Sequence, residues 1–148
     1  MDDRTGAAYF ALFNEIGIIS QLSRALFEAR LPDGVLVTHF SVVNHLMRLG
    51  DGKTPLEMAR AFQVPKTSMT HTLQGLEAMG YVQIAPNPAD RRSKCVWLTE
   101  AGRAFRDDAI GRLMPDLERM AGAIGPERVA AILPELEAIR AYLDENRD

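Results

Sequence analysis

Cysteine is almost absent from this sequence, in which Cys95 is the only one among 148 residues. A single cysteine excludes an intramolecular disulfide and any zinc site built from several cysteines. Long apolar runs are missing as well, since none approaches the roughly 20 residues that a membrane-spanning helix needs. The first residues, 1–4, also lack the basic segment of a secretory signal peptide. We therefore expect a cytoplasmic protein with no membrane partner.

The sequence has no large excess of charge of either sign, because its formal net charge is -3. Its distribution is more informative than its total. Residues 51–94 carry a net charge of +2, whereas residues 1–50 carry -1 and residues 95–148 carry -4. A weakly basic segment between acidic flanks is compatible with a localised DNA-binding face. Scattered surface charge gives asymmetries of this size as well, so the charge alone does not decide the matter.

Recognisable catalytic and metal-binding patterns are missing too. The sequence shows no nucleophile with a base partner, no glycine-rich phosphate loop and no paired carboxylates in a plausible cleft. His39 and His45 are six residues apart, which fits one helical face poorly, and no set of Cys, Asp or Glu completes a site with His71. We therefore predict that the protein is not an enzyme and has neither a metal nor a cofactor.

Hydrophobic residues, at 47%, and charged residues, at 25%, are present in the proportions of an ordinary globular domain. Apolar residues at helical spacing predict a mainly α-helical chain. The expected helices span residues 5–30, 37–49, 55–62, 66–79 and 99–121, followed by a last helical region from residue 126. We expect Pro115 to kink the long helix and Pro134 to divide the last region into two segments.

The expected N-terminal helix is long and unusually apolar near its start. Its stripe at helical spacing consists of Leu12, Ile16, Ile19, Leu22 and Leu26. A stripe of this length indicates burial against more than the core of one small domain. It favours contact with a second subunit.

Residues 54–79 predict a helix-turn-helix. Thr54 and Glu57 form a capping box, and Pro55 stands at the first helical position, where its missing N–H costs nothing. Residues 63–65 are a short turn, after which a second helix begins near Lys66. A short turn of this kind projects the second helix at a fixed angle from the first.

The second helix of this pair has two different faces. Its apolar positions, which predict the buried face, are Met69, Leu73 and Leu76. The polar positions on the opposite stripe are Lys66, Thr67, Thr70, His71 and Gln74, with Ser68 beside them near the helix start. Short hydroxyl and amide side chains suit contact with base edges and phosphates, and a helix start favours phosphate. The alternative for this helix by itself is a solvated polar face without a ligand.

Residues 81–85 and 93–98 predict two strands of a hairpin, with residues 86–90 as its loop. Val96 and Leu98 are expected on one face, and Cys95 and Trp97 on the other. The tip carries three cations and one acid, namely Asp90, Arg91, Arg92 and Lys94. A loop tip can reach the minor groove of DNA, whose potential attracts arginine, and Asp90 is positioned to pair with Arg92. The alternative is a solvated charge cluster at a turn.

Residues 54–102 resemble the MarR family of bacterial winged helix-turn-helix regulators. Asp90-Arg91-Arg92 is similar to the Asp-x-Arg wing motif of that family, and residues 98–102 are similar to its Leu-Thr-x-x-Gly motif. Residues 69–73, together with Leu76, Glu77 and Gly80, match the frame of its recognition helix. The resemblance extends more loosely to the flanking helices and so covers nearly the whole chain.

The resemblance implies a mainly α fold with a small β-hairpin wing, in one MarR-like domain over residues 1–148. Residues 35–99 would form the DNA-binding lobe, and residues 1–34 and 100–148 the dimerisation helices. It also implies a homodimer on a pseudo-palindromic site in double-stranded DNA, and a small-molecule pocket where the dimerisation helices join the lobe. Arg92 would be the arginine in the minor groove, with Asp90 as its partner.

Two positions depart from the family pattern. His71 stands where the family often has arginine, and Gly75 occupies another position that is frequently basic. Fewer fixed charges imply weaker phosphate contacts or a different base preference.

These observations predict a sequence-specific transcription regulator, specifically a ligand-responsive repressor. Two alternatives stay open. One is a winged-helix module that binds protein instead of DNA, and the other is a redox or metal sensor of the same fold, in which Cys95 would be the sensing thiol.

Overall fold

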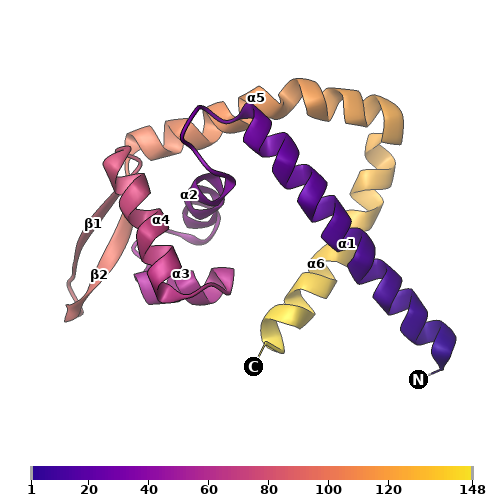
Figure 1. Cartoon of the computed structure of the whole chain (residues 1–148), viewed down its shortest axis with the longest axis horizontal. Helices are drawn as coiled ribbons and strands as arrows, with labels where there is room; N and C mark the ends of the chain where they lie inside the picture. Colours follow the sequence, from indigo (N-terminus) through magenta and orange to yellow (C-terminus); the bar gives the residue numbers. More distant parts are fainter. Residues whose placement is uncertain (1, 148) are drawn as a thin grey trace. The chain divides into compact units, whose positions relative to one another are not determined.

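The computed structural model describes residues 2–147. They fall into two compact units, one ending at Arg112 and the other beginning at Leu113. The elements follow the order α1 (Asp3–Arg30), α2 (Val37–Leu49), α3 (Pro55–Phe62), α4 (Lys66–Ala78), β1 (Val82–Asn87), β2 (Asp90–Leu98), α5 (Glu100–Ile124) and α6 (Pro126–Glu145) (Figure 1). The prediction of a mainly helical fold with one β-hairpin is confirmed. The single-domain organisation over residues 1–148 stays a prediction.

Side-chain caps fix where two of the helices begin. Asp2 accepts a hydrogen bond from the backbone N–H of Thr5 at 2.7 Å, so it caps α1. At α3, the Thr54 hydroxyl accepts from the N–H of Glu57 at 3.2 Å, and the Glu57 carboxylate accepts from the N–H of Thr54 at 2.7 Å. The predicted capping box is therefore confirmed, with Pro55 at the first helical position.

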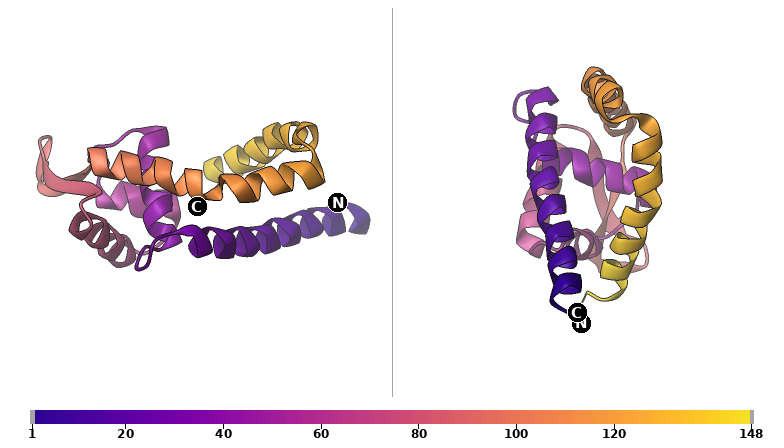
Figure 2. Two further views of the ribbon diagram at one scale, coloured as in Figure 1. Left: turned by 90° about the horizontal axis from the view of Figure 1, so that it is seen from above. Right: turned by 90° about the vertical axis from the view of Figure 1, so that its right-hand side faces the viewer.

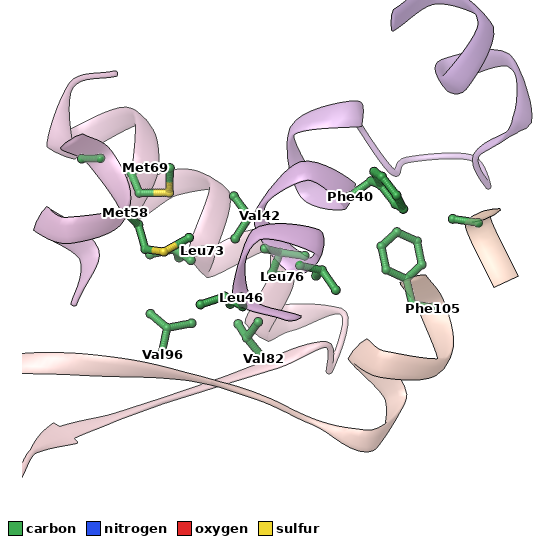
Figure 3. Close-up of a cluster of buried hydrophobic side chains, with 13 residues drawn as sticks. Phe40, Val42, Leu46, Met58, Met69, Leu73, Leu76, Val82, Val96 and Phe105 are labelled. Carbon is green, nitrogen blue, oxygen red and sulfur yellow. The ribbon is translucent and has the colours of Figure 1, made fainter. Parts of the chain in front are cut away.

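The hydrophobic core of the first unit lies between α2, α3, α4, the hairpin and the first turns of α5 (Figure 3). Its apolar side chains point toward one another from all of these elements. The largest of those that are fully buried are Leu46, Met58, Leu73, Leu76, Val42, Val43 and Val96. Burial of these groups supplies most of the driving force that holds α4 and the hairpin to the rest of the unit.

The hairpin pairs β1 with β2 in antiparallel register, with Ile84 opposite Val96 and Pro86 opposite Lys94. Its strands are longer than predicted, since only residues 88 and 89 separate them. The prediction of a loop over residues 86–90 is therefore wrong, and Asp90 already lies in β2. The ladder tolerates Pro86 because its nitrogen lies on the same outer edge of β1 as that of Ile84, where no bond to β2 is lost.

Cys95 and Val96 are both buried in β2, whereas Trp97 is 41% exposed. The indole of Trp97 lies against Gly52, whose φ of +79° is rarely adopted by other residues. A Cβ at Gly52 would come within 2.9 Å of the ring. Both the space and the backbone angle thus favour glycine at this position.

The junction between β2 and α5 explains the Leu-Thr-x-x-Gly pattern in physical terms. The Thr99 hydroxyl donates to the carbonyl of Gly80 at 2.6 Å and accepts from the N–H of Gly102 at 3.0 Å, so Thr99 caps α5. The Tyr81 carbonyl lies directly against the Cα of Gly102, in the space that a Cβ would fill. The Tyr81 ring stacks on Phe105 with centroids 4.4 Å apart.

The predicted division of the last helical region at Pro134 is wrong, because α6 is continuous from Pro126 to Glu145. A proline removes one intrahelical hydrogen bond and can bend a helix without ending it. Helix α5 likewise continues through Pro115. The kink expected there stays a prediction.

Neither α1 nor α6, each taken by itself, contains a buried residue within the described part of the chain. On α1 the exposed fractions reach 74% for Phe10 and 67% for Leu22. Figure 2 shows α1 as one long, unbroken helix. Its apolar stripe is therefore present, as predicted, and is not covered by the rest of its unit.

Candidate nucleic-acid interface

The turn between α3 and α4 has a defined conformation. Gln63 adopts φ +52° and ψ +45° and is the one described non-glycine residue with a positive φ. Its side-chain amide donates to the carbonyl of Arg60 at 2.7 Å, and this carbonyl also accepts from the backbone N–H of Gln63 at 3.2 Å. The chain then turns through residues 64 and 65 into α4. The angle between the two helices is thus set by local hydrogen bonds as well as by core packing.

Helix α4 divides into the two faces that its sequence predicted. Met69, Leu73 and Leu76 are all buried, so this face is confirmed. On the other stripe Thr70 is half-buried, and five of the predicted polar residues are exposed, namely Lys66, Thr67, Ser68, His71 and Gln74. This arrangement leaves a row of hydroxyl, amide, imidazole and ammonium groups open to a ligand.

The structure gives a steric reason for the glycine at position 75. A Cβ there would lie 3.1 Å from Nε2 of His39, a residue of α2 that is only 8% exposed. The Nδ1 atom of His39 accepts a hydrogen bond from the N–H of Leu36 at 2.9 Å. Burial, and secondarily the electrostatic interaction with His71, hold the pKa of His39 below its ordinary value. Packing of α4 on a neutral imidazole therefore limits the side chain at position 75.

The hairpin carries the predicted pair of Asp90 and Arg92. One carboxylate oxygen of Asp90 accepts from the backbone N–H of Arg92 at 3.0 Å and from its Nε at 3.2 Å. The side chain of Arg92 is nevertheless 91% exposed. Arg91 and Lys94 are exposed beside it. The pairing orients one guanidinium at the tip and leaves its remaining donors available to a ligand.

Further hydrogen bonds hold the tip of the hairpin together. The side-chain Oδ1 of Asn87 accepts from the backbone N–H of Ala89 at 3.0 Å, and the side-chain Nδ2 of Asn87 donates to the Ser93 hydroxyl at 2.9 Å. The Ser93 hydroxyl in turn donates to the carbonyl of Asp90 at 3.2 Å. Figures 1 and 2 show this hairpin extending from the helices of its unit.

A hollow of about 600 Å³ lies between the hairpin and the helix-turn-helix. It brings together half of the predicted site residues, which are Lys66, Thr70, Asp90, Arg92 and Lys94. The other five, Thr67, Ser68, His71, Gln74 and Arg91, do not line it. Its remaining lining residues are Thr54, Pro55, Leu56, Asn87 and Ser93. The structure thus places the wing and the recognition helix on two sides of one concave surface.

Sequence reasoning missed the residues of this hollow that come from the start of α3 and two that lie in the strands of the hairpin, Asn87 and Ser93. It also missed Glu77, which lines an adjacent hollow of about 170 Å³ together with Thr70, Gln74, Ile84 and Lys94. The spacing of Glu77, three residues after Gln74 and seven after Thr70, was the signal that places it on the same stripe.

A separate groove of about 310 Å³ lies between α1 and α2. Its lining combines two aromatic rings, one aliphatic side chain, three hydroxyl groups and one guanidinium, from Phe27, Phe40, Val37, Ser20, Ser23, Ser41 and Arg24. Mixed apolar and polar lining is typical of small-molecule sites.

Among residues 2–147, no helix combines the length and the apolar character that crossing a bilayer requires. Within the same residues, no three His, Cys, Asp or Glu side chains gather closely enough to hold a metal ion.

Comparison with known proteins finds similarity to one family. Residues 33–93, which contain the helix-turn-helix and most of the hairpin, match the model of the MarR family. A mutant of MarR from E. coli complexed with operator DNA is 25% identical, with a TM-score of 0.72, over 89% of this chain and 95% of the other.

Two further solved structures show the same fold at lower identity. The transcriptional regulator BldR from Sulfolobus solfataricus is 23% identical over 96% of this chain and 99% of the other, with a TM-score of 0.79. BpsR from Bordetella bronchiseptica, whose DNA binding is regulated by 6-hydroxynicotinic acid, is 21% identical over 88% and 98%, with a TM-score of 0.71. The resemblance to the MarR family is therefore confirmed.

Proposed function

We propose that this chain, which has the fold of a MarR-family transcription regulator, is a sequence-specific DNA-binding repressor. The observation that carries the proposal is the concave surface between α4 and the wing. It joins a polar recognition stripe to an exposed arginine that is oriented by Asp90. Neither feature is needed for the core of the unit, since both lie on its surface.

In this proposal α4 enters the major groove. Thr70, His71 and Gln74 face the base edges, while Lys66, Thr67 and Ser68 at the helix start contact phosphates. Glutamine suits adenine, because its amide can donate and accept in one plane. The net charge of +2 over residues 51–94 suits a phosphate backbone.

The wing would act in the adjacent minor groove. Arg92 has donors free for base edges and for the strong negative potential of a narrow groove. Arg91 and Lys94 would neutralise neighbouring phosphates. Asp90 would hold the Arg92 side chain in its binding direction, which lowers the entropy lost on binding.

The protein would act as a homodimer. Exposed apolar side chains recur along α1 and, separately, along α6, where Tyr142 is 65% exposed and Ile132 54% exposed. Apolar surfaces of this extent normally mark an interface. A two-fold dimer would present two recognition helices to a pseudo-palindromic operator at a separation of roughly 34–36 Å, about one turn of DNA.

A small molecule would release the protein from DNA by binding the groove between α1 and α2. A ligand in this groove would lower operator affinity if it bound more tightly to a dimer whose recognition helices are too far apart or too close for DNA. The loss would equal the difference between its affinities for that dimer and for the DNA-binding dimer. The relative BpsR, whose DNA binding responds to 6-hydroxynicotinic acid, supports a response of this kind.

Fluorescence anisotropy tests the proposal. The purified protein is titrated with DNA from upstream of its own gene and with scrambled DNA, at two salt concentrations. Tight binding that prefers the upstream fragment and falls steeply with salt is the expected result. Equal, weak binding to both fragments, together with salt-insensitive capture of a protein partner, would favour a protein-interaction module. Binding that changes on addition of peroxide or zinc would favour a redox or metal sensor.

A further inference from the structure

The outer edge of β2 is occupied at Val96 by a neighbouring loop. The N–H of Gly52 donates to the carbonyl of Val96 at 2.7 Å, and the N–H of Val96 donates to the carbonyl of Lys53 at 2.8 Å. Both polar backbone groups of Val96 therefore point away from β1. Val96 and its partner Ile84 form one of the pairs of an antiparallel ladder that exchange no hydrogen bonds.

The backbone N–H of Ile84 consequently points away from β2, toward the other edge of the hairpin. There it donates to a carboxylate oxygen of Glu77 at 2.8 Å. Glu77 belongs to α4, so this bond joins the recognition helix directly to the wing. At the pair formed by Ile84 and Val96, the hairpin is thus held on both edges, by residues 52–53 on one side and by Glu77 on the other.

Glu77 lies on the polar stripe of α4 that the proposed function turns toward DNA. It lines the hollow that also contains Thr70, Gln74 and Lys94. A carboxylate in this place repels the phosphates of any DNA that the stripe approaches. Simple electrostatics therefore predicts that removal of Glu77 would strengthen DNA binding.

A carboxylate also holds the other edge of the wing base. Asp51 accepts from the backbone N–H of Leu98 at 3.3 Å and lies 3.6 Å from the guanidinium of Arg103. Between the pair of Ile84 and Val96 and the tip, the hairpin is held by hydrogen bonds within the hairpin itself. The direction in which Arg92 is presented is therefore set at this base.

We propose that Glu77 is a positioning residue that sets the wing against the recognition helix. Its bond to Ile84 fixes the separation between the stripe of α4 and Arg92, so that both fit adjacent grooves of one DNA site together. The proposal rests on the proposed DNA-binding function. According to this proposal, the positioning effect of Glu77 raises operator affinity by more than the repulsion between its carboxylate and the DNA phosphates lowers it.

Two variants separate the hydrogen bond from the charge. Glu77→Gln and Glu77→Ala both remove the negative charge, but only glutamine keeps an oxygen that can accept from Ile84. We expect Glu77→Ala to lower operator affinity roughly tenfold, the cost of one lost charge-assisted bond, and Glu77→Gln to recover most of that loss. Binding to scrambled DNA should rise to the same extent in both variants. Alanine is the strongest helix former, so α4 is retained.

A double-mutant cycle with Arg92→Ala tests whether Glu77 acts through the wing. If it does, Glu77→Ala has little further effect once Arg92 is gone, and the two losses are not additive. Additive losses, or a higher operator affinity for Glu77→Ala, would overturn the proposal. Equal operator affinity in the Gln and Ala variants would do the same.

Amide hydrogen exchange tests the hydrogen bond between Ile84 and Glu77 in the absence of DNA. The Ile84 amide should exchange faster in Glu77→Ala than in the parent, and slowly again in Glu77→Gln. Unchanged exchange in Glu77→Ala would contradict the assignment whatever the DNA results. A parent protein that binds no DNA selectively would instead refute the proposed function, so the two failures are distinguishable.

Discussion

The carbonyl oxygen of Tyr81 occupies the space that a Cβ on Gly102 would fill. This contact joins the end of the recognition-helix segment to the first turn of α5, beside the stacked rings of Tyr81 and Phe105. It lies at the base of the wing, where β1 begins and β2 has just ended. A change at this point therefore affects both the stability of the unit and the orientation of the wing.

Gly102→Ala should destabilise the protein by about 1–3 kcal/mol, because the obstructing atom belongs to the backbone and cannot rotate away. Urea unfolding followed by circular dichroism measures the change. Gly111→Ala is the matched control in the same helix, since nothing lies within 4 Å of its added Cβ. It should be neutral or stabilising by up to about 1 kcal/mol. Equal stabilities of the two variants would refute the steric account.

Arg92→Ala should weaken operator binding by about 1–3 kcal/mol and reduce the salt slope by about one, because it removes a DNA contact and a cation. The exposed side chain makes no core contact, so the melting temperature should be unchanged. Anisotropy and thermal melts measure the two effects. Arg128→Ala, which removes an exposed cation from α6, is the control. A folded Arg92→Ala protein with the affinity of the parent would exclude the minor-groove role.

Gln74→Ala should alter sequence preference more than total affinity, because a glutamine that reads a base discriminates between bases by about 1–3 kcal/mol. Lys66→Ala is the contrasting variant, since loss of a phosphate contact weakens binding to all sequences alike. Competition assays with single-base operator variants separate the two. Equal losses on operator and scrambled DNA for Gln74→Ala would count against base reading.

Leu22→Glu should dissociate the dimer, because it places a charge in the apolar stripe of α1, where the leucine is 67% exposed in the single chain. A buried, unpaired carboxylate should raise the dissociation constant at least tenfold, or roughly 1.4 kcal/mol. Sedimentation velocity over a range of concentrations measures it. Gln21→Glu, one position away in the sequence but on the opposite face of α1, adds the same charge off the stripe as a control. A parent protein that sediments as a monomer at all concentrations would refute the dimer.

Much of the site follows from local sequence. Three features of the site join residues that are close in the sequence. These are the capping box at Thr54, the buried face of α4 and the pairing of Asp90 with Arg92. Spacing and side-chain chemistry are sufficient for such contacts. The wing tip differed from expectation because Pro86 breaks a strand only where its nitrogen faces the partner, and the sequence does not reveal which edge it faces.

The other contacts depend on how distant segments pack. The bond from Ile84 to Glu77 requires the angle of the hairpin against α4, and the crowding of Gly75 by His39 requires the placement of α2. Neither angle is encoded in the spacing of the residues concerned. The continuity of α6 through Pro134 likewise depends on how the helix accommodates one missing hydrogen bond. The presence of a proline in the sequence does not show whether the helix ends there or continues.

His39 makes stability depend on pH. Its pKa lies below the ordinary value of 6.5, chiefly because it is buried and secondly because of its electrostatic interaction with His71. The unfolded chain therefore takes up a proton at a higher pH than the folded chain. Its stabilising contribution is complete above about pH 6.5 and is lost as the pH falls below that value. Protonation would also remove the acceptor that Nδ1 offers to Leu36.

Urea unfolding between pH 7.5 and pH 5 should therefore show a falling free energy of unfolding. His45, whose pKa is also lowered, first by burial and then by Arg48 and Lys53, adds to the trend in the same direction. His39→Asn isolates the contribution of His39, since asparagine keeps an acceptor near the position of Nδ1 and does not titrate. The slope with pH should be shallower in His39→Asn than in the parent. Parallel slopes would show that protonation of His39 does not drive the loss of stability.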